Sequence, residues 1–227
     1  MMISINEPTL SPEGRHILER LTSHGWKVSW YIDPILGGHA GCDIDNQKII
    51  FRSVELSNDP AVVLHELLHF DLYDKGYPFV RANTATTNQA VQFGVTILND
   101  VCHHIMMKQE FERAGFYFGT QEVPSTVKQI DELVKTNPTL NPVFLGGGEI
   151  FSAALYMRAK FLTINKAKIE LLARYISKNN KHLTLNKISE AINMLPEPGC
   201  SVDEYNERLN KLLSILGLDN FITISRK

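Results

Sequence analysis

The chain has 227 residues, 44% of them hydrophobic, which is enough to bury a full core as one larger domain or as a main domain with a smaller appendage. Its 23 Lys and Arg residues and its 25 Asp and Glu residues give a formal charge of −2. No overall basic surface is therefore available for binding nucleic acid or an anionic membrane.

The cysteines and the first residues indicate the compartment. Cys42, Cys102 and Cys200 stand far apart and are odd in number, which argues against a disulfide framework or a cysteine-based zinc finger. The opening MMISINEPTLSPEG lacks the basic and apolar regions of a signal peptide. No stretch approaches the roughly 20 apolar residues of a membrane span. We therefore expect a cytoplasmic protein that does not cross a membrane.

The first part of the chain is predicted to contain one helix and then strands. Residues 11–24 have apolar side chains at helical spacing and are followed by Gly25, which favours an amphipathic helix. KVSWYI at 27–32 has the aromatic and β-branched content of a strand, and CDIDNQKIIF at 42–51 predicts a hairpin or a strand.

The best-defined predicted helix comes next. Asn58 or Asp59 can cap it, Pro60 fits its first position, and Gly76 stands where a helix would stop. The intervening AVVLHELLHFDLYDK is apolar almost all round in its first half. This pattern predicts a buried helix.

The rest of the chain is predicted to be helical around one irregular connection. A helix over 88–113 has apolar residues at alternating spacings of four and three, and a helix over 123–135 has capping signals at Ser125. TNPTLNPVFLGGG at 136–148 contains Pro and Gly throughout and is the best candidate for a boundary. Beyond it we expect only helices, over 149–162, 165–178, 185–194 and 202–216.

Residues 65–69 read His-Glu-Leu-Leu-His, an HExxH motif within the buried helix. At positions i and i+4, the imidazoles of His65 and His69 lie on one helix face and can bind one Zn²⁺. Glu66 is rotated by about 100° from His65, so it misses the ion but can reach a metal-bound water. Zinc lowers the pKa of that water, whose proton the carboxylate can take. Histidine and glutamate inside an apolar helix are costly unless they are paired or bound to a metal.

With these residues the chain resembles the zincin metallopeptidases, particularly their thermolysin-like gluzincin branch. In that family a strand at the edge of the active-site sheet precedes the HExxH helix, as QKIIFRS precedes NDPAVVLHELLH here. A second helix donates the third ligand from Asn-Glu, which is followed by an Asp four residues after the Glu. This chain has LNDVCHH, with Asn99, Asp100 and then His104. The resemblance covers about residues 27–115 and departs from the family where Asp100 replaces the glutamate.

Three residues therefore compete for the third ligand position. Asp100 matches the gluzincin ligand by motif, although its side chain is one methylene shorter. His104 lies one turn further on the same face, so the two residues can act as ligand and orienting partner in either order. His103 lies on the other polar flank of this helix. The alternative to a ligand role for His103 is a side chain that is simply exposed to solvent. Periodicity does not choose among the three, and we place the site on the face of Asp100 and His104.

The predicted fold class is α+β, with a small mixed β-sheet packed on the HExxH helix in a zincin-like arrangement and a mainly helical C-terminal region. Residues 1–120 are predicted to form the catalytic region, and residues 121–227 a helical region packed on it. No metal ligand is expected from the region after Gly148, because it has no clustered titratable residues.

The resemblance implies Zn²⁺-dependent hydrolysis of a peptide bond in a protein or peptide substrate, with Glu66 as general base and His65, His69 and the Asp100/His104 face as metal site. Two other classes of function stay open. One is a regulatory or interaction protein that keeps the zincin fold and metal without turnover. The other is a helical interaction module in which HELLH is core. Neither the substrate's identity nor the oligomeric state follows from the residues.

Overall fold

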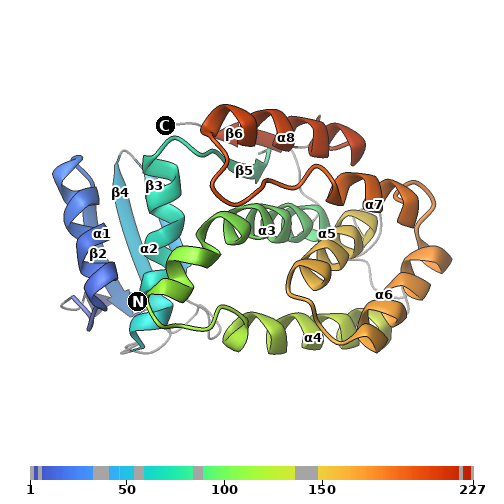
Figure 1. Ribbon diagram of the computed structural model, residues 1–227, viewed down its shortest axis with the longest axis horizontal. Helices are drawn as coiled ribbons and strands as arrows, with labels where there is room; N and C mark the ends of the chain where they lie inside the picture. The colour runs from blue at the N-terminus through green and yellow to red at the C-terminus, as the bar shows by residue number, and fades with distance from the viewer. Residues whose placement is uncertain are drawn as a thin grey trace. The chain divides into compact units, whose positions relative to one another are not determined.

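Four strands near the N-terminus form a mixed sheet from segments rich in β-branched and aromatic residues. The computed structural model describes residues 3–4, 7–32, 41–45, 47–53, 59–83, 89–135, 148–219 and 222–225. The strand order is β1-β2-β4-β3, with β2 parallel to β4 and the other two pairs antiparallel (Figure 1). The strands are β1 (Ile3–Ser4), β2 (Lys27–Ile32), β3 (Gly41–Asp45) and β4 (Lys48–Ser53).

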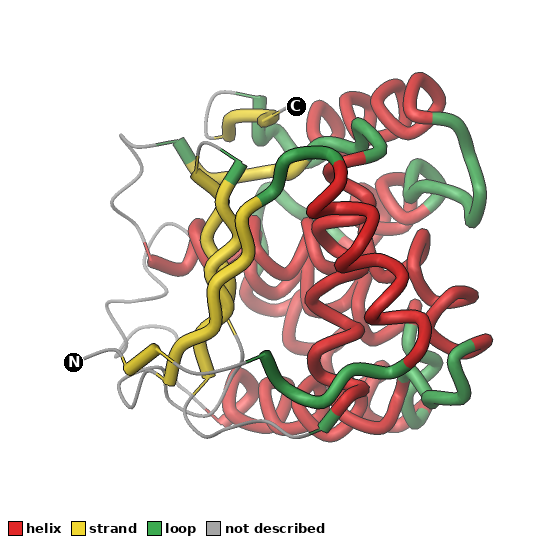
Figure 2. The backbone as a smooth tube through the Cα atoms, turned by 90° about the vertical axis from the view of Figure 1, so that its left-hand side faces the viewer, coloured by secondary structure: helices red, strands yellow, loops and turns green. Residues whose placement is uncertain are grey.

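The predicted strand at 27–32 is thus confirmed, and the segment at 42–51 forms the hairpin of β3 and β4. Two helices, α1 (Pro12–Ser23) and α2 (Pro60–Asp74), lie on the same face of this sheet (Figures 1 and 2). Trp30 of β2 stacks on Phe51 of β4 at 4.2 Å between ring centroids, and Phe51 meets Phe70 of α2 edge-on at 5.9 Å. These aromatic contacts hold α2 on the sheet.

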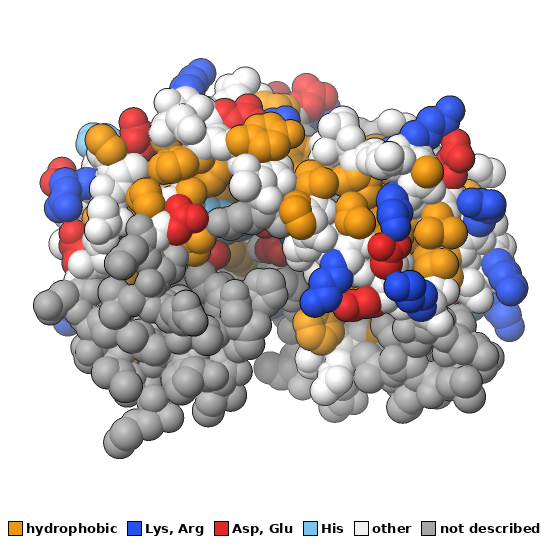
Figure 3. Space-filling model, turned by 90° about the horizontal axis from the view of Figure 1, so that it is seen from below, with side chains coloured by type: hydrophobic (Ala, Val, Ile, Leu, Met, Phe, Trp, Pro, Cys, Tyr) orange, Lys and Arg blue, Asp and Glu red, His pale blue; other side chains and the backbone are white. Residues whose placement is uncertain are grey.

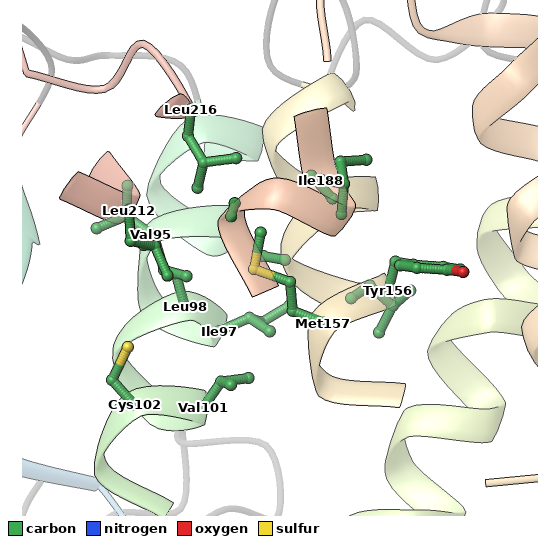
Figure 4. Close-up of a cluster of buried hydrophobic side chains, with 14 of the residues drawn as sticks. Val95, Ile97, Leu98, Val101, Cys102, Tyr156, Met157, Ile188, Leu212 and Leu216 are labelled. Atoms are coloured by element: carbon green, nitrogen blue, oxygen red, sulfur yellow. The ribbon is translucent and has the colours of Figure 1, made fainter. Parts of the chain in front are cut away.

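A helical core forms the second part of the fold. Its helices are α3 (Gln89–Arg113), α4 (Gly119–Lys135), α5 (Gly148–Phe161), α6 (Lys166–Asn179), α7 (Leu185–Ile192) and α8 (Val202–Ile215). Figure 4 shows Leu98 and Cys102 of α3, Met157 of α5, Ile188 of α7 and Leu212 of α8 gathered in one buried cluster. A two-stranded antiparallel sheet of β5 (Phe79–Ala82) and β6 (Ile222–Ser225) belongs to the same part.

The chain divides into two compact units, and α3 contributes to both. The first unit comprises Met1–Lys75 and Gln109–Phe116, and the second comprises Gly76–Lys108 and Tyr117–Lys227. The α+β class is confirmed for a chain in which helices predominate. The catalytic role expected for residues 1–120 stays a prediction, and so does the packing of residues 121–227 on that region.

Two local predictions were wrong. Helix α4 begins at Gly119, so Ser125 lies inside the helix and is not its N-cap. The segment beyond residue 149 is not only helical, because β6 pairs with β5, and neither strand was predicted. The predicted connection at 136–148 lies outside the described residues up to 147, and Gly148 begins α5.

The outer face over α4 and α6 carries charges of both signs. Lys168 of α6 pairs with Asp131 of α4, and Figure 3 shows Lys and Arg side chains beside Asp and Glu, with hydrophobic side chains between them.

No helix in the described ranges is long and apolar enough to pass through a bilayer.

Candidate metal centre

Helix α2 begins and ends at the residues that the sequence predicts. The Asp59 carboxylate accepts a hydrogen bond from the backbone N–H of Ala61 at 2.9 Å, Pro60 occupies the first helical position, and Gly76 has a φ of +95° just beyond the end. The other predicted cap, Asn58, lies outside the described residues. The two caps fix the length of the helix that carries the HExxH motif.

Two buried carboxylates attach the C-terminal half of α2 to the α1 region. Asp71 is 1% exposed and pairs with Arg20 of α1 and with Lys75. One Asp74 oxygen accepts a hydrogen bond from Trp26 at 2.8 Å, and the other lies 2.5 Å from Nδ1 of His24. Because these contacts and the Phe70 contact fix the rotation of α2, they also fix the direction of its histidines.

His65 and His69 lie side by side on α2, as their spacing predicts. Their rings stack with centroids 5.1 Å apart at an interplanar angle of 26°, and their Nε2 atoms are 3.2 Å apart. Two nitrogens bound to a tetrahedral zinc at about 2.0–2.1 Å are separated by about 3.3–3.4 Å. The pair therefore fits zinc without a change of helix geometry. Phe111 of α3 meets the His65 ring edge-on at 6.1 Å between centroids.

His103 and His104 are neighbours on α3, but their side chains have different surroundings. His103 is fully buried, its Nε2 atom lies 3.0 Å from the carbonyl oxygen of Pro78, and its ring lies 4.7 Å from that of Phe79. Burial lowers the pKa of His103 to about 4, while the hydrogen bond to Pro78 acts in the opposite direction. The ring is thus neutral and donates Nε2–H to Pro78. The alternative of a solvated His103 was wrong.

His104 is 2% exposed, and Phe118 packs edge-on against its ring at 4.8 Å between centroids. In the described part of the chain, the structure brings together one group of three potential metal ligands. They are His65, His69 and His104, whose ligand atoms all lie within 4.8 Å of one another. Of the three candidates for the third position, His104 is therefore the residue that joins the HExxH histidines.

Asp100 does not belong to that group, although it precedes His104 by one helical turn. Burial raises the pKa of the Asp100 carboxyl to about 7; the Arg158 guanidinium opposes this shift, and the Glu122 carboxylate adds to it. Arg158 of α5 is itself ion-paired with Glu122 of α4. The sequence analysis did not predict this cluster of charged side chains. Arg158 lies within the otherwise apolar helix of residues 148–161, and a buried arginine indicates a nearby carboxylate.

Asn99 and Glu66 complete the residues named by the motifs. The Asn99 side-chain oxygen accepts a hydrogen bond from the backbone N–H of Val80 at 2.9 Å, so this buried amide holds strand β5 on α3. Glu66 is partly exposed and directly follows His65 on α2.

No family model, curated protein or solved structure matches this chain. The resemblance to zincins stays a prediction from the HExxH motif, the segment before it and the LNDVCHH segment.

Proposed function

We propose that this protein is a zinc-dependent metallopeptidase in which His65, His69 and His104 hold the metal and Glu66 is the general base. The observation that carries the proposal is the group of three imidazoles, two of which belong to an HExxH motif. The mixed sheet packed on the motif helix is compatible with a zincin-like fold.

The donor set suits a catalytic zinc ion. Imidazole nitrogens are common zinc ligands, and three protein ligands leave a fourth position for water or substrate. Three neutral imidazoles also leave the full double positive charge of the ion at the site. Zinc held there would polarise a substrate carbonyl and lower the pKa of the attacking water.

Glu66 supplies the proton transfers. Its side chain is rotated by about 100° around α2 from His65, which directs it beside the metal position and keeps it from binding the ion. The carboxylate takes a proton from the attacking water and then delivers it to the nitrogen of the departing amine. A site that only stores metal would not need a carboxylate at this position.

The proposed substrate is a peptide or a protein, and the proposed location is the cytoplasm. Cys102 and Cys200 are free thiols, as is usual in a reducing compartment. The balanced charge of the chain supports neither nucleic acid nor an anionic membrane as a partner.

The test combines metal analysis with one substitution. The purified protein should bind about one zinc per chain. Glu66→Gln should retain that zinc while cleavage of a peptide library, followed by mass spectrometry, falls by at least about 100-fold. Glu190→Gln, at an exposed position of α7, is the matched control and should cleave like the wild type.

Three outcomes would contradict parts of the proposal. A protein that takes up no zinc would refute the metal site and favour HELLH as a core segment of an interaction module. Zinc binding without cleavage by the wild type would favour a regulatory protein. Full activity of Glu66→Gln would remove Glu66 as the base.

A further inference from the structure

The end of α6, the turn after it and the start of α7 carry positive charges that have no negative partners. Between Glu170 and Glu190 the sequence has no Asp or Glu. Four exposed basic residues lie in this segment, and we call them the α6–α7 basic patch: Arg174, Lys178, Lys181 and Lys187. None of the four makes an ion pair with a residue that the structure describes. Because the whole chain has a formal charge of −2, the rest of it is net negative.

The patch differs from the first turns of α6, where the basic side chains are balanced within the protein. Lys166 lies 3.8 Å from Glu170, and Lys168 pairs with Asp131 of α4. Helix formation does not account for the patch either. Lys187 is the third residue of α7, where the positive end of the helix dipole makes a cation unfavourable. The charges of the patch are thus available to a binding partner.

The turn between α6 and α7 is held in place by hydrogen bonds. Both helices pack on α5 (Figure 1). The Glu149 carboxylate of α5 accepts hydrogen bonds at 2.8 to 2.9 Å from the backbone N–H groups of Lys181, His182 and Leu183. The Asn180 amide donates a further hydrogen bond to the Leu183 carbonyl oxygen at 3.1 Å. The patch therefore projects from a backbone that is already ordered, which lowers the entropic cost of binding a partner.

The chemistry of the patch fits a short acidic segment of a protein. Carboxylates along such a segment can each meet an exposed cation without covering more of the surface. A nucleic acid fits less well, because its phosphates continue beyond the patch over a chain that is otherwise net negative. A second copy of this chain also fits less well, because acidic residues that follow the patch have partners of their own. Glu197 pairs with Arg208, and Glu207 pairs with Lys211.

We propose that the α6–α7 basic patch is a docking surface for an acidic segment of another protein. The proposal goes beyond the proposed function, because it involves no residue of the metal centre and requires no bound metal. It gives the C-terminal helices a role in selecting the protein to which this chain binds.

Fluorescence anisotropy with two labelled peptides, octaglutamate and octaglutamine, tests the proposal. The wild type should bind octaglutamate, more weakly as salt is added, and should not bind octaglutamine. Lys178→Glu/Lys181→Glu should weaken octaglutamate binding by at least about 10-fold, because it places like charges opposite each other. Lys178→Gln/Lys181→Gln removes the same charges without reversing them and should weaken binding by a smaller factor.

The matched control is Lys27→Glu/Lys48→Glu, which makes the same change in net charge at two exposed lysines of β2 and β4 in the first unit. It should bind octaglutamate within about 2-fold of the wild type, which separates a local surface from an effect of net charge. Thermal unfolding shows whether each variant is folded. A thymidine oligonucleotide of the same charge as octaglutamate should bind the wild type at least about 10-fold more weakly than the peptide does.

Several outcomes would overturn the proposal. One is a wild type that does not bind octaglutamate at low salt, and another is equal binding by the two charge-reversal variants. Tighter binding of the oligonucleotide would indicate a nucleic-acid surface. Salt-sensitive dimers that Lys178→Glu/Lys181→Glu abolishes would indicate self-association. Zinc content and peptide cleavage are measured separately, so each of these results leaves the proposed function standing.

Discussion

His103 has its Nε2 atom 3.0 Å from the Pro78 carbonyl oxygen, whereas the ring of neighbouring His104 lies against Phe118. The two side chains differ by about 100° of rotation around α3. His103 donates its hydrogen bond to the Pro78 backbone carbonyl, directly before β5, and burial lowers the pKa of its ring so that the neutral form is favoured. His104 is the histidine on α3 whose ligand atom lies near those of His65 and His69.

The first prediction at this scale compares the two histidines. His104→Ala should lower zinc affinity by at least about 10-fold, because a ligand is lost. His103→Ala should leave zinc affinity nearly unchanged but should destabilise the fold by about 2–4 kcal/mol, because it leaves a cavity and an unpaired carbonyl. Zinc titration and urea unfolding of both variants measure the two effects separately. The reverse order of zinc affinities would transfer the third ligand to His103.

The sequence predicted the motif residues well and the third ligand poorly. His65 and His69 lie within one helix, so their separation depends only on local geometry, which the i and i+4 spacing determines. The choice between His103 and His104 depends on what packs against each flank of α3. The partners, Pro78 and Phe118, come from other segments and were not visible in the periodicity.

At the scale of elements, the difference between local sequence signals and contacts with distant segments explains which helices and strands were predicted. The bounds of α2 followed from Asp59, Pro60 and Gly76, all of which act locally. Strands β5 and β6 were missed because each is only four residues long and finds its partner far along the chain, with Val80 opposite Ile224. Short strands of this kind gain their stability from pairing, which a local pattern does not report.

A close approach between α3 and α5 gives the prediction at this scale. A Cβ atom at Gly94 would lie 2.7 Å from Cγ2 of Ile150 and 2.9 Å from the backbone nitrogen of Phe151. Alanine has the higher helix propensity by about 1 kcal/mol, but here it would force the two helices apart. We expect Gly94→Ala to destabilise the protein by about 1–3 kcal/mol.

Urea unfolding of the metal-free protein measures this change. The matched control is Thr96→Ala, two residues further along α3, where the side chain is exposed and its hydroxyl donates a hydrogen bond to the Gln92 carbonyl oxygen. It should change stability by less than about 0.5 kcal/mol. A Gly94→Ala protein as stable as the control would show that α3 and α5 do not pack as closely as described.

At the scale of the whole molecule, the helix that carries His104 is part of the core of the second unit. Val95, Leu98 and Cys102 of α3 are buried in one cluster with side chains of α5 and α8 (Figure 4). The predicted metal site therefore depends on helices that follow residue 147, although they provide no ligand to it.

The last prediction removes those helices. A chain that ends at Gly146 would lose α5 to α8 and β6, and it would expose the apolar face of α3 to water. Burying a single large apolar side chain contributes about 1.5–3 kcal/mol, so the loss of several such contacts on α3 exceeds the stability of an ordinary domain. We expect this shortened chain to be insoluble or unfolded and to bind no zinc tightly.

Production of residues 1–146 together with a second chain of residues 147–227 provides the control. The cluster that joins α3 to α5 and α8 is made of side-chain contacts, so the two pieces should associate and recover zinc binding, because the covalent connection is the only thing removed. Solubility, circular dichroism and zinc content of the single piece and of the pair measure the result. If residues 1–146 alone fold, bind zinc and cleave peptides as well as the full chain, the helices after Gly148 form an independent domain. The apolar side of α3 would then have to be stable in water, which its composition argues against.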